Sequence, residues 1–145
     1  ATLAVIFGNR DFFPDNLVTE ARKDIQAVFQ EYDIRPVMVG ESDSKLSSIE
    51  TYENAKICAN LFKAHRDDID GILVVLPNFG DEKAVADTIK LSGLQVPILV
   101  QAYPDELNAF GRAPIAPKRA LRNPFTTWQT PINFFKSALK LSPIG

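Results

Sequence analysis

The hydrophobic positions of the first hundred residues alternate between short continuous runs and longer stretches with helical spacing. Short apolar runs bounded by turn residues predict strands that are buried in a sheet. Four such runs occur, at residues 3–7, 34–39, 71–76 and 97–100. The second run contains Pro36, which favours the start of a strand or an edge position because proline cannot donate a ladder hydrogen bond.

Three segments between these runs predict helices. Residues 16–32 carry apolar side chains spaced by three and four, which is typical of an amphipathic helix. Ser47-Ser48-Ile49-Glu50 fits a capping box that opens a second helix, whose apolar stripe is Ala55, Cys58, Ala59 and Phe62. Asp81 is expected to cap a third helix that continues to about residue 91.

Strands that alternate with helices predict right-handed crossovers and a parallel sheet with helices on both faces. We therefore predict a doubly wound α/β domain of the flavodoxin-like or Rossmann-like kind. Its parallel sheet should have about four strands in the order 2-1-3-4, followed by an irregular, proline-rich C-terminal tail.

Charge divides the chain into two unequal parts after Glu106. Residues 1–106 hold all 18 acidic and 10 of the 16 basic residues, a net charge of −8, whereas residues 107–145 hold six basic residues and no acidic one. Five prolines interrupt that second part and leave room for only one short helix, at about 132–141. We expect an α/β domain over 1–106 and a separate tail over 107–145.

Composition narrows the class of protein. A chain of 145 residues with a net charge of −2 fits one globular domain and gives no reason to expect nucleic acid as a partner. Its single cysteine, Cys58, has no partner for an internal disulfide, which favours a reducing compartment. No secretory signal or membrane-length apolar run occurs. We expect a cytoplasmic protein that does not bind membranes.

The predicted topology brings three loops to the edge where the strands end, and this edge is where such sheets bind ligands. The loops are residues 8–14, 77–81 and 101–106. The first loop combines an amide, a guanidinium, a carboxylate and two aromatic rings, a set that suits a polyhydroxylated ligand such as a sugar. Two alternatives stay open: its phenylalanines plug the core, or Arg10 only pairs with Asp11 or Asp81 and steadies the loop.

Other chemistries find little support in these loops. No glycine-rich phosphate-binding motif is present. Asp15 and Asp81-Glu82 place carboxylates at two helix N-termini, where they are expected to satisfy the free amides that a phosphate would need. The only histidine, His65, is expected at the far end of the second helix. Asp11, Asp81 and Asp105 could gather a hard cation, but Asp81 is expected to serve as a cap.

Three segments resemble a known family. Gly8-Asn9-Arg10-Asp11-Phe12-Phe13-Pro14, Leu76-Pro77-Asn78-Phe79-Gly80-Asp81-Glu82 and the stretch from Val96 to Glu106 are similar to the amino-terminal domain of the L-fucose isomerase family and its L-arabinose isomerase relatives. The resemblance covers about residues 3–107. It implies an aldose–ketose isomerase of carbohydrate metabolism in which this domain helps to close the active site of a neighbouring subunit.

The resemblance also implies site residues and a cofactor. The substrate-binding residues it implies are Asn9, Arg10, Phe12, Asn78 and Phe79. The family uses a divalent cation, usually manganese, whose Glu, Asp and His ligands lie in later domains, so we expect no catalytic residue, metal ligand or cofactor in this chain. The expected partners are a weakly bound sugar and either a homo-oligomer or the missing isomerase domains.

Two hypotheses of function follow. In the first, the chain is a truncated or remnant isomerase, inactive by itself, whose tail is unrelated to the family and arose by a frameshift. In the second, it is a free-standing sugar-binding or protein-interaction module that uses the same loops.

Overall fold

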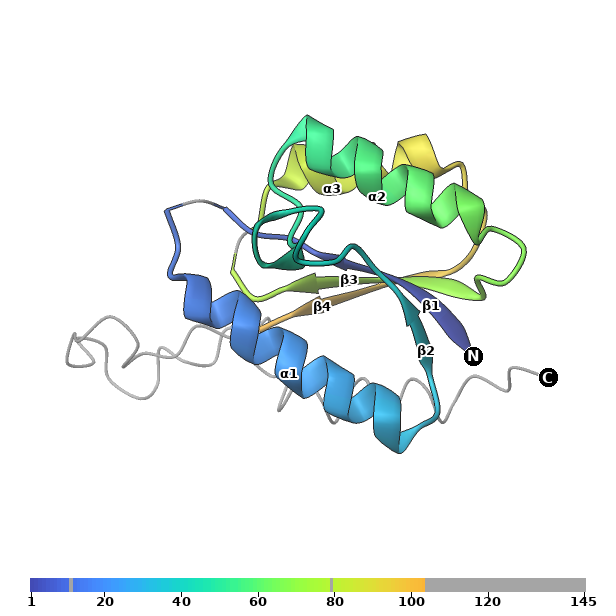
Figure 1. The fold of residues 1–145 in the computed structure, drawn as a ribbon, viewed down its shortest axis with the longest axis horizontal. Coiled ribbons are helices and arrows are strands. Elements are labelled where there is room, and N and C mark those ends of the chain that lie inside the picture. Colours follow the sequence, from blue (N-terminus) through green and yellow to red (C-terminus); the bar gives the residue numbers. More distant parts are fainter. Residues whose placement is uncertain (11, 79, 104–145) are drawn as a thin grey trace, which may run out of the picture.

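The computed structural model describes residues 1–10, 12–78 and 80–103. These residues form a parallel sheet between two helical layers (Figure 1). The elements in chain order are β1 (Thr2–Phe7), α1 (Asp15–Glu31), β2 (Arg35–Val37), the short 3₁₀ turn η1 (Lys45–Ser47), α2 (Tyr52–Ala64), β3 (Gly71–Leu76), α3 (Glu82–Ser92) and β4 (Ile98–Ala102).

The strand order β2-β1-β3-β4 and the parallel pairing confirm the predicted doubly wound fold. β3 pairs with β1 on one side and with β4 on the other, with Ile72 opposite Ile98. A central strand of this kind is covered on both faces, which explains why β3 is apolar throughout. β2 is a three-residue edge strand that contains Pro36, in agreement with the expectation for that segment.

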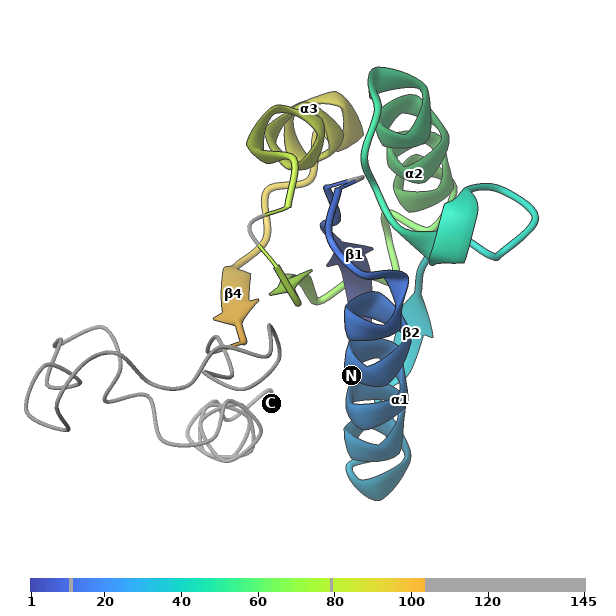
Figure 2. The same cartoon turned by 90° about the vertical axis from the view of Figure 1, so that its left-hand side faces the viewer.

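Alternate strand residues pack into two hydrophobic clusters, one on each face of the sheet. α1 covers the face that contains Val5, Phe7, Leu73 and Val75, and α2 and α3 cover the other face. The two views agree on this arrangement, with α2 and α3 side by side above the sheet and α1 below it (Figures 1 and 2). The edge strand β4 is less well covered, since Ile98 and Val100 are about half exposed.

One prediction about helix starts is wrong. The capping box of α2 is formed by Thr51 and Asn54, not by residues 47–50: the Thr51 hydroxyl accepts from the Asn54 backbone N–H, and the Asn54 side chain accepts from the Thr51 N–H. The segment before it is extended instead, because Ile49 forms a parallel bridge with Gly8. Its N–H donates to the carbonyl of Phe7 (2.8 Å), so Ile49 extends the β1 ladder and cannot begin a helix.

The two acidic helix starts differ from each other. Asp81 caps α3 as predicted, and its carboxylate accepts from the Ala84 backbone N–H at 2.8 Å. Asp15 does not satisfy a free amide of α1, whose N-cap is Pro14 and has no side-chain cap. The Asp15 carboxylate instead forms an ion pair with Lys45 Nζ at 3.1 Å.

Some expectations fall on residues outside the described ranges. These are the tail over 107–145 with its helix at 132–141, and the side chains of Asp11, Phe79 and Asp105. Within the described ranges, none of the helices combines the length and apolar character that crossing a membrane requires.

Candidate functional site

The candidate site is the sheet edge at which the strands end, which faces the viewer in Figure 2. β1 and β3 are neighbours in the sheet, so the loops that follow them start side by side. The side-chain amide of Asn78 donates to Oδ1 of Asn9 over 2.6 Å and joins the two loops directly. The structure therefore brings together two of the three predicted loops through two of the predicted site residues.

Two glycines of these loops leave room for the Leu76 side chain. A Cβ at Gly8 would lie 2.8 Å from Leu76 Cδ2 and 3.6 Å from the Cα of Gly80. Gly80 has a φ of +65°, in the left-handed region that favours glycine, and a Cβ there would lie 3.0 Å from the same Leu76 atom. The local sequence gives no reason for these two glycines, because their roles depend on contacts between distant segments.

Asn9 is completely buried, and both ends of its amide are bonded. Its Nδ2 donates to Oε1 of Glu50, and its Oδ1 accepts from Asn78. Asn78 in turn accepts from the backbone N–H of Gly80 at 2.8 Å. This arrangement satisfies the buried polar groups of Asn9, as is usual for polar side chains in a protein interior.

Arg10 is half-buried and Phe12 is exposed in the first loop. Phe12 is 75% exposed, so it does not plug the core, while the neighbouring Phe13 is half-buried. The Arg10 guanidinium lies 5.9 Å from the centroid of the Phe12 ring, within the range of a cation–π contact. The Phe12 and Phe13 rings are 4.7 Å apart, and the Phe13 N–H donates to the carbonyl of Arg10. A cation and an aromatic face thus lie together at the loop surface.

The described part of the third loop, residues 101–103, packs against the rest of the domain. Gln101 lies within β4 and is buried, beside Val75 on the face that α1 covers. Tyr103 packs into the same cluster, and its backbone N–H donates to the carbonyl of Leu76 at 3.1 Å. Burial, with a smaller contribution from the charge of Asp24, raises the pKa of Tyr103 to about 12.

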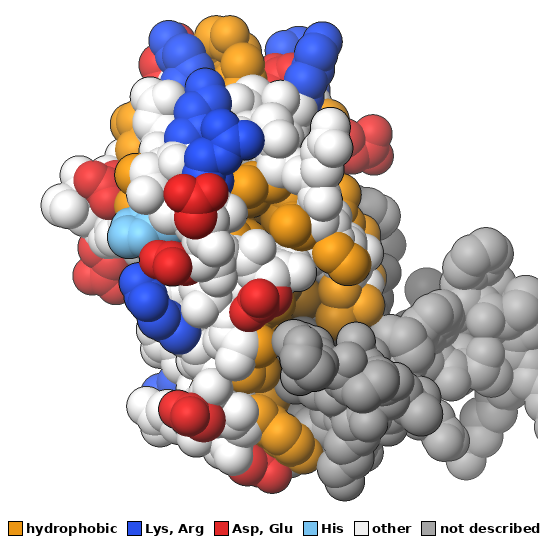
Figure 3. Space-filling model, turned by 90° about the vertical axis from the view of Figure 1, so that its right-hand side faces the viewer, with side chains coloured by type: hydrophobic (Ala, Val, Ile, Leu, Met, Phe, Trp, Pro, Cys, Tyr) orange, Lys and Arg blue, Asp and Glu red, His pale blue; other side chains and the backbone are white. Residues whose placement is uncertain are grey.

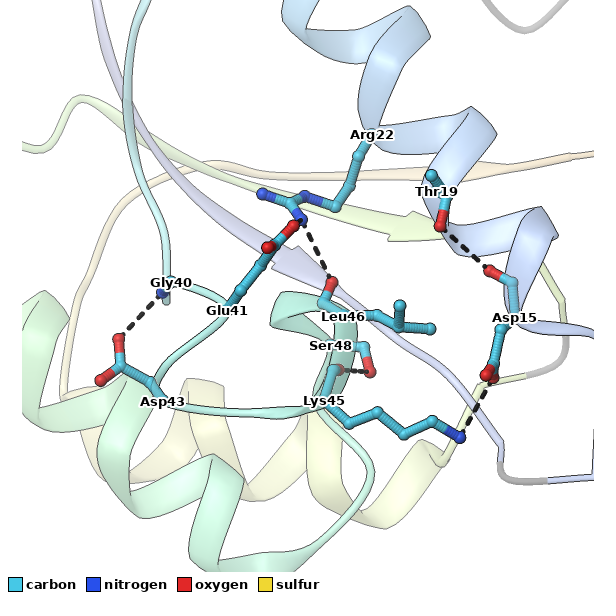
Figure 4. Close-up of polar contacts among 9 residues, drawn as sticks. All are labelled: Asp15, Thr19, Arg22, Gly40, Glu41, Asp43, Lys45, Leu46 and Ser48. Atoms are coloured by element: carbon cyan, nitrogen blue, oxygen red, sulfur yellow. Dashed lines mark hydrogen bonds and ion pairs between the residues drawn. The ribbon is translucent and has the colours of Figure 1, made fainter.

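The segment that carries Glu50 is held against α1 by polar contacts (Figure 4). Arg22 donates to Oε1 of Glu41 at 3.2 Å and to the carbonyl of Leu46 at 3.5 Å. Leu46 and Ser47 both have positive φ angles, of 56° and 54°, which are uncommon for residues with a Cβ. Together with the Asp15–Lys45 ion pair, these contacts direct the chain back to the end of β1.

Glu50 is the residue of this site that sequence reasoning missed, because it was assigned to a capping box. It is half-buried, its Oε1 accepts from Asn9, and its backbone N–H donates to Asn54 Oδ1. No property of the local sequence distinguishes it from the other glutamates. Its role depends on the approach of residue 50 to residue 9, which are 41 positions apart.

The described residues do not fit a metal centre. Within 1–10, 12–78 and 80–103, no three His, Cys, Asp or Glu side chains group as metal ligands would. Asp81 caps α3 and Glu50 accepts from Asn9, so these two described carboxylates near the loops already have partners. His65 is the C-cap of α2, at the end of the helix remote from these loops.

Charged groups of both signs and a hydrophobic strip lie on the opposite side of the molecule (Figure 3).

Cys58 is a core residue and not a nucleophile. It is fully buried in the cluster between the sheet and α2, as its place on the apolar stripe predicted. Burial raises the pKa of the Cys58 thiol to about 12. A thiol with such a pKa is almost entirely protonated at neutral pH, whereas the thiolate is the reactive form.

The fold and this edge define a doubly wound α/β domain whose candidate ligand groups lie on the loops after β1 and β3. Residues 4–113 match the family model described as the fucose/sulfoquinovose isomerase N-terminal domain, so the chain belongs to that family. The match extends past the change in composition after Glu106. Neither the curated proteins nor the solved structures include a match to this chain.

Proposed function

We propose that this domain contributes sugar-binding loops to an aldose–ketose isomerase, with Arg10 and Phe12 as direct contacts. Membership of the fucose/sulfoquinovose isomerase family supports the reaction class. The observation that carries the site is the pair itself: the guanidinium of the half-buried Arg10 lies 5.9 Å from the centroid of an aromatic ring that is 75% exposed. Guanidinium N–H groups can donate to several hydroxyls while the ring covers an apolar face of the sugar.

The second loop supplies the other side of the proposed site. Asn78 is half-buried and joined to Asn9, so position 79 lies next in sequence to a residue fixed against the first loop. We include Asn78 and Phe79 in the proposed sugar site on this basis and on the resemblance of their segment to the family. We give Asn9, which was also expected to bind the substrate, a supporting position in this proposal, because its side chain is completely buried.

The remaining parts of the active site belong, in this proposal, to protein outside the described residues. The family's divalent cation has no fitting set of ligands among them. A metal-assisted proton or hydride shift needs such ligands. The proposed partners are a second copy of the chain or further isomerase domains, which would cover the exposed Phe12 ring.

Inactivity of the isolated 145-residue chain is therefore part of the proposal. Incubation with L-fucose, L-arabinose or sulfoquinovose and manganese should give no ketose above the blank. Turnover that a chelator abolishes would contradict this.

The hypothesis that the tail arose by a frameshift is tested separately by reading the gene downstream of codon 106 in all three frames.

Sugar binding is tested by following backbone amide shifts during titration with L-fucose and sulfoquinovose. Because only part of the ligand would be enclosed, we expect a dissociation constant on the order of millimolar. Arg10→Ala should abolish the response of residues 9–13 and 78–81. Arg66→Ala serves as the matched control, since Arg66 is exposed beyond the far end of α2.

If neither sugar perturbs those residues, or if Arg10→Ala responds like the unchanged chain, the sugar site is wrong. The exposed Phe12 would then favour the second candidate, a protein-interaction module that uses the same loop. A change in oligomeric state with Phe12→Ser, measured by light scattering, would support that candidate.

A further inference from the structure

We propose that Glu50 and Asn9 are positioning residues that set the sugar-contacting loops relative to each other without touching the ligand. This inference rests on the proposed function for its final step. Its structural part concerns a chain of hydrogen bonds that runs from Glu50 through Asn9 and Asn78 to the backbone of Gly80.

The two ends of this chain determine the direction of every bond in it. A carboxylate only accepts hydrogen bonds, and a backbone N–H only donates them. Glu50 therefore requires the NH₂ group of Asn9 to face it, which turns Asn9 Oδ1 toward Asn78. Asn78 then presents its own NH₂ to Asn9 and its Oδ1 to the N–H of Gly80. Rotating either amide by half a turn would set acceptor against acceptor and donor against donor.

Burial makes this direction energetically important. Asn9 has no exposed surface, so water cannot replace a bond that its amide loses. The backbone of Glu50 is also fixed, because its N–H donates to Asn54 Oδ1 at 3.2 Å, next to the capping box of α2. The turn at Leu46 and the Ile49–Gly8 bridge bring residue 50 to this place.

The chain of bonds spans both proposed contact segments. Asn9 immediately precedes Arg10, so fixing Asn9 fixes the point at which the exposed loop leaves the core. Asn78 and Gly80 flank position 79, and the bond between them constrains the backbone on both sides of it. Glu50 thus sets the placement of Asn9, which precedes Arg10, relative to Asn78.

A reversal of polarity tests this mechanism in the full chain. Asn9→Asp places a second carboxylate against Glu50 and should disrupt the chain of bonds. Adding Glu50→Gln should restore it, because the glutamine NH₂ and the Asn78 NH₂ can both donate to the new carboxylate at position 9. The double variant also keeps the net charge of the original chain. Asn60→Asp is the control for added charge, since Asn60 is exposed on α2.

The first measurement is hydrogen exchange of the Gly80 amide without any ligand. We expect exchange to accelerate about ten-fold or more in Asn9→Asp and to return to within about three-fold of the original in the double variant. The control should match the original chain. If Asn9→Asp does not fold, recovery of a folded chain with a protected Gly80 by Glu50→Gln supports the same conclusion. Unchanged exchange in Asn9→Asp, or no recovery in the double variant, would overturn the proposal.

The second measurement is the affinity for L-fucose and sulfoquinovose. Affinity should fall about ten-fold in Asn9→Asp and recover in the double variant, in parallel with Gly80. If Gly80 responds as expected but affinity is the same in all variants, the positioning role is wrong. If the original chain binds neither sugar, the proposed function fails, while the exchange of Gly80 still decides whether Glu50 and Asn9 set the loops.

Discussion

Asn78 Nδ2 donates a 2.6 Å hydrogen bond to Asn9 Oδ1, across 69 positions of the sequence. This bond joins the loops after β1 and β3 at the sheet edge where doubly wound domains bind ligands. It occurs beside Gly8 and Gly80, which leave room for the Leu76 side chain, and it connects the segment of Arg10 to the segment that contains position 79.

Asn78→Leu should destabilise the domain by about 1–3 kcal/mol, because Asn9 Oδ1 and the N–H of Gly80 would lose their partner. Urea unfolding followed by circular dichroism measures the change in the free energy of unfolding. Asn60→Leu, on the exposed surface of α2, should change it by less than about 0.5 kcal/mol. Equal effects of the two substitutions would show that the bond contributes nothing to stability.

Gly8→Ala should cost about 1–3 kcal/mol, since the added Cβ would lie 2.8 Å from Leu76 Cδ2 and 3.3 Å from Val85 Cγ2. Gly40→Ala is the matched control, because its Cβ would meet only ordinary contacts, at 3.4 Å or more. Thermal unfolding of both variants should show a lower midpoint for Gly8→Ala alone. A midpoint equal to that of Gly40→Ala would mean that the Leu76 and Val85 side chains move aside without loss of stability.

Thr51→Ala should destabilise the domain by about 1 kcal/mol, because its hydroxyl accepts from the Asn54 backbone N–H at the start of α2. Ser47→Ala should have a smaller effect, as the buried Ser47 hydroxyl has no hydrogen-bond partner among the described residues. Chemical denaturation of the two variants compares them directly. A larger loss of stability in Ser47→Ala than in Thr51→Ala would support a capping box at residues 47–50 instead.

The native Cys58 thiol should not react with Ellman's reagent at pH 8, because it is buried and has a pKa of about 12. Unfolding in urea should make one thiol per chain reactive. Rapid labelling without denaturant would contradict the burial of this side chain.

The raised pKa of Cys58 also predicts a dependence of stability on pH. The contribution of Cys58 to stability is complete below about pH 9 and is lost as the pH rises toward 12, because the thiol of the unfolded chain releases its proton first.

Much of the fold could be predicted because its signals are local. The unbroken apolar run of β3, the three- and four-residue spacing of α1 and the Asp81 cap all report structure formed within a few residues. The strand order also followed, since alternating strands and helices restrict the possible topologies. The candidate edge was predictable for the same reason, because parallel strands end on one side of the sheet.

Other features depended on partners far away in sequence. Ser47-Ser48-Ile49-Glu50 has the composition of a capping box, but Ile49 pairs with Gly8 at the end of β1, and the true cap moves to Thr51. The backbone groups of this segment could form hydrogen bonds within a local capping box or with a strand edge that the fold brings close. The tertiary contact prevails here because it also buries Ile49 completely.

By itself, the sequence determined the α/β class, the order of the elements and the core positions, since these follow from local pattern and composition. The resemblance of its loop segments also indicated the family to which the chain belongs. Only the tertiary structure decided that Asn9 is buried, that Glu50 accepts a hydrogen bond from it and that Phe12 is exposed. The physical reason is that a polar side chain takes its role from the donors and acceptors that reach it. For Asn9 these come from positions 50 and 78, and only folding brings them together.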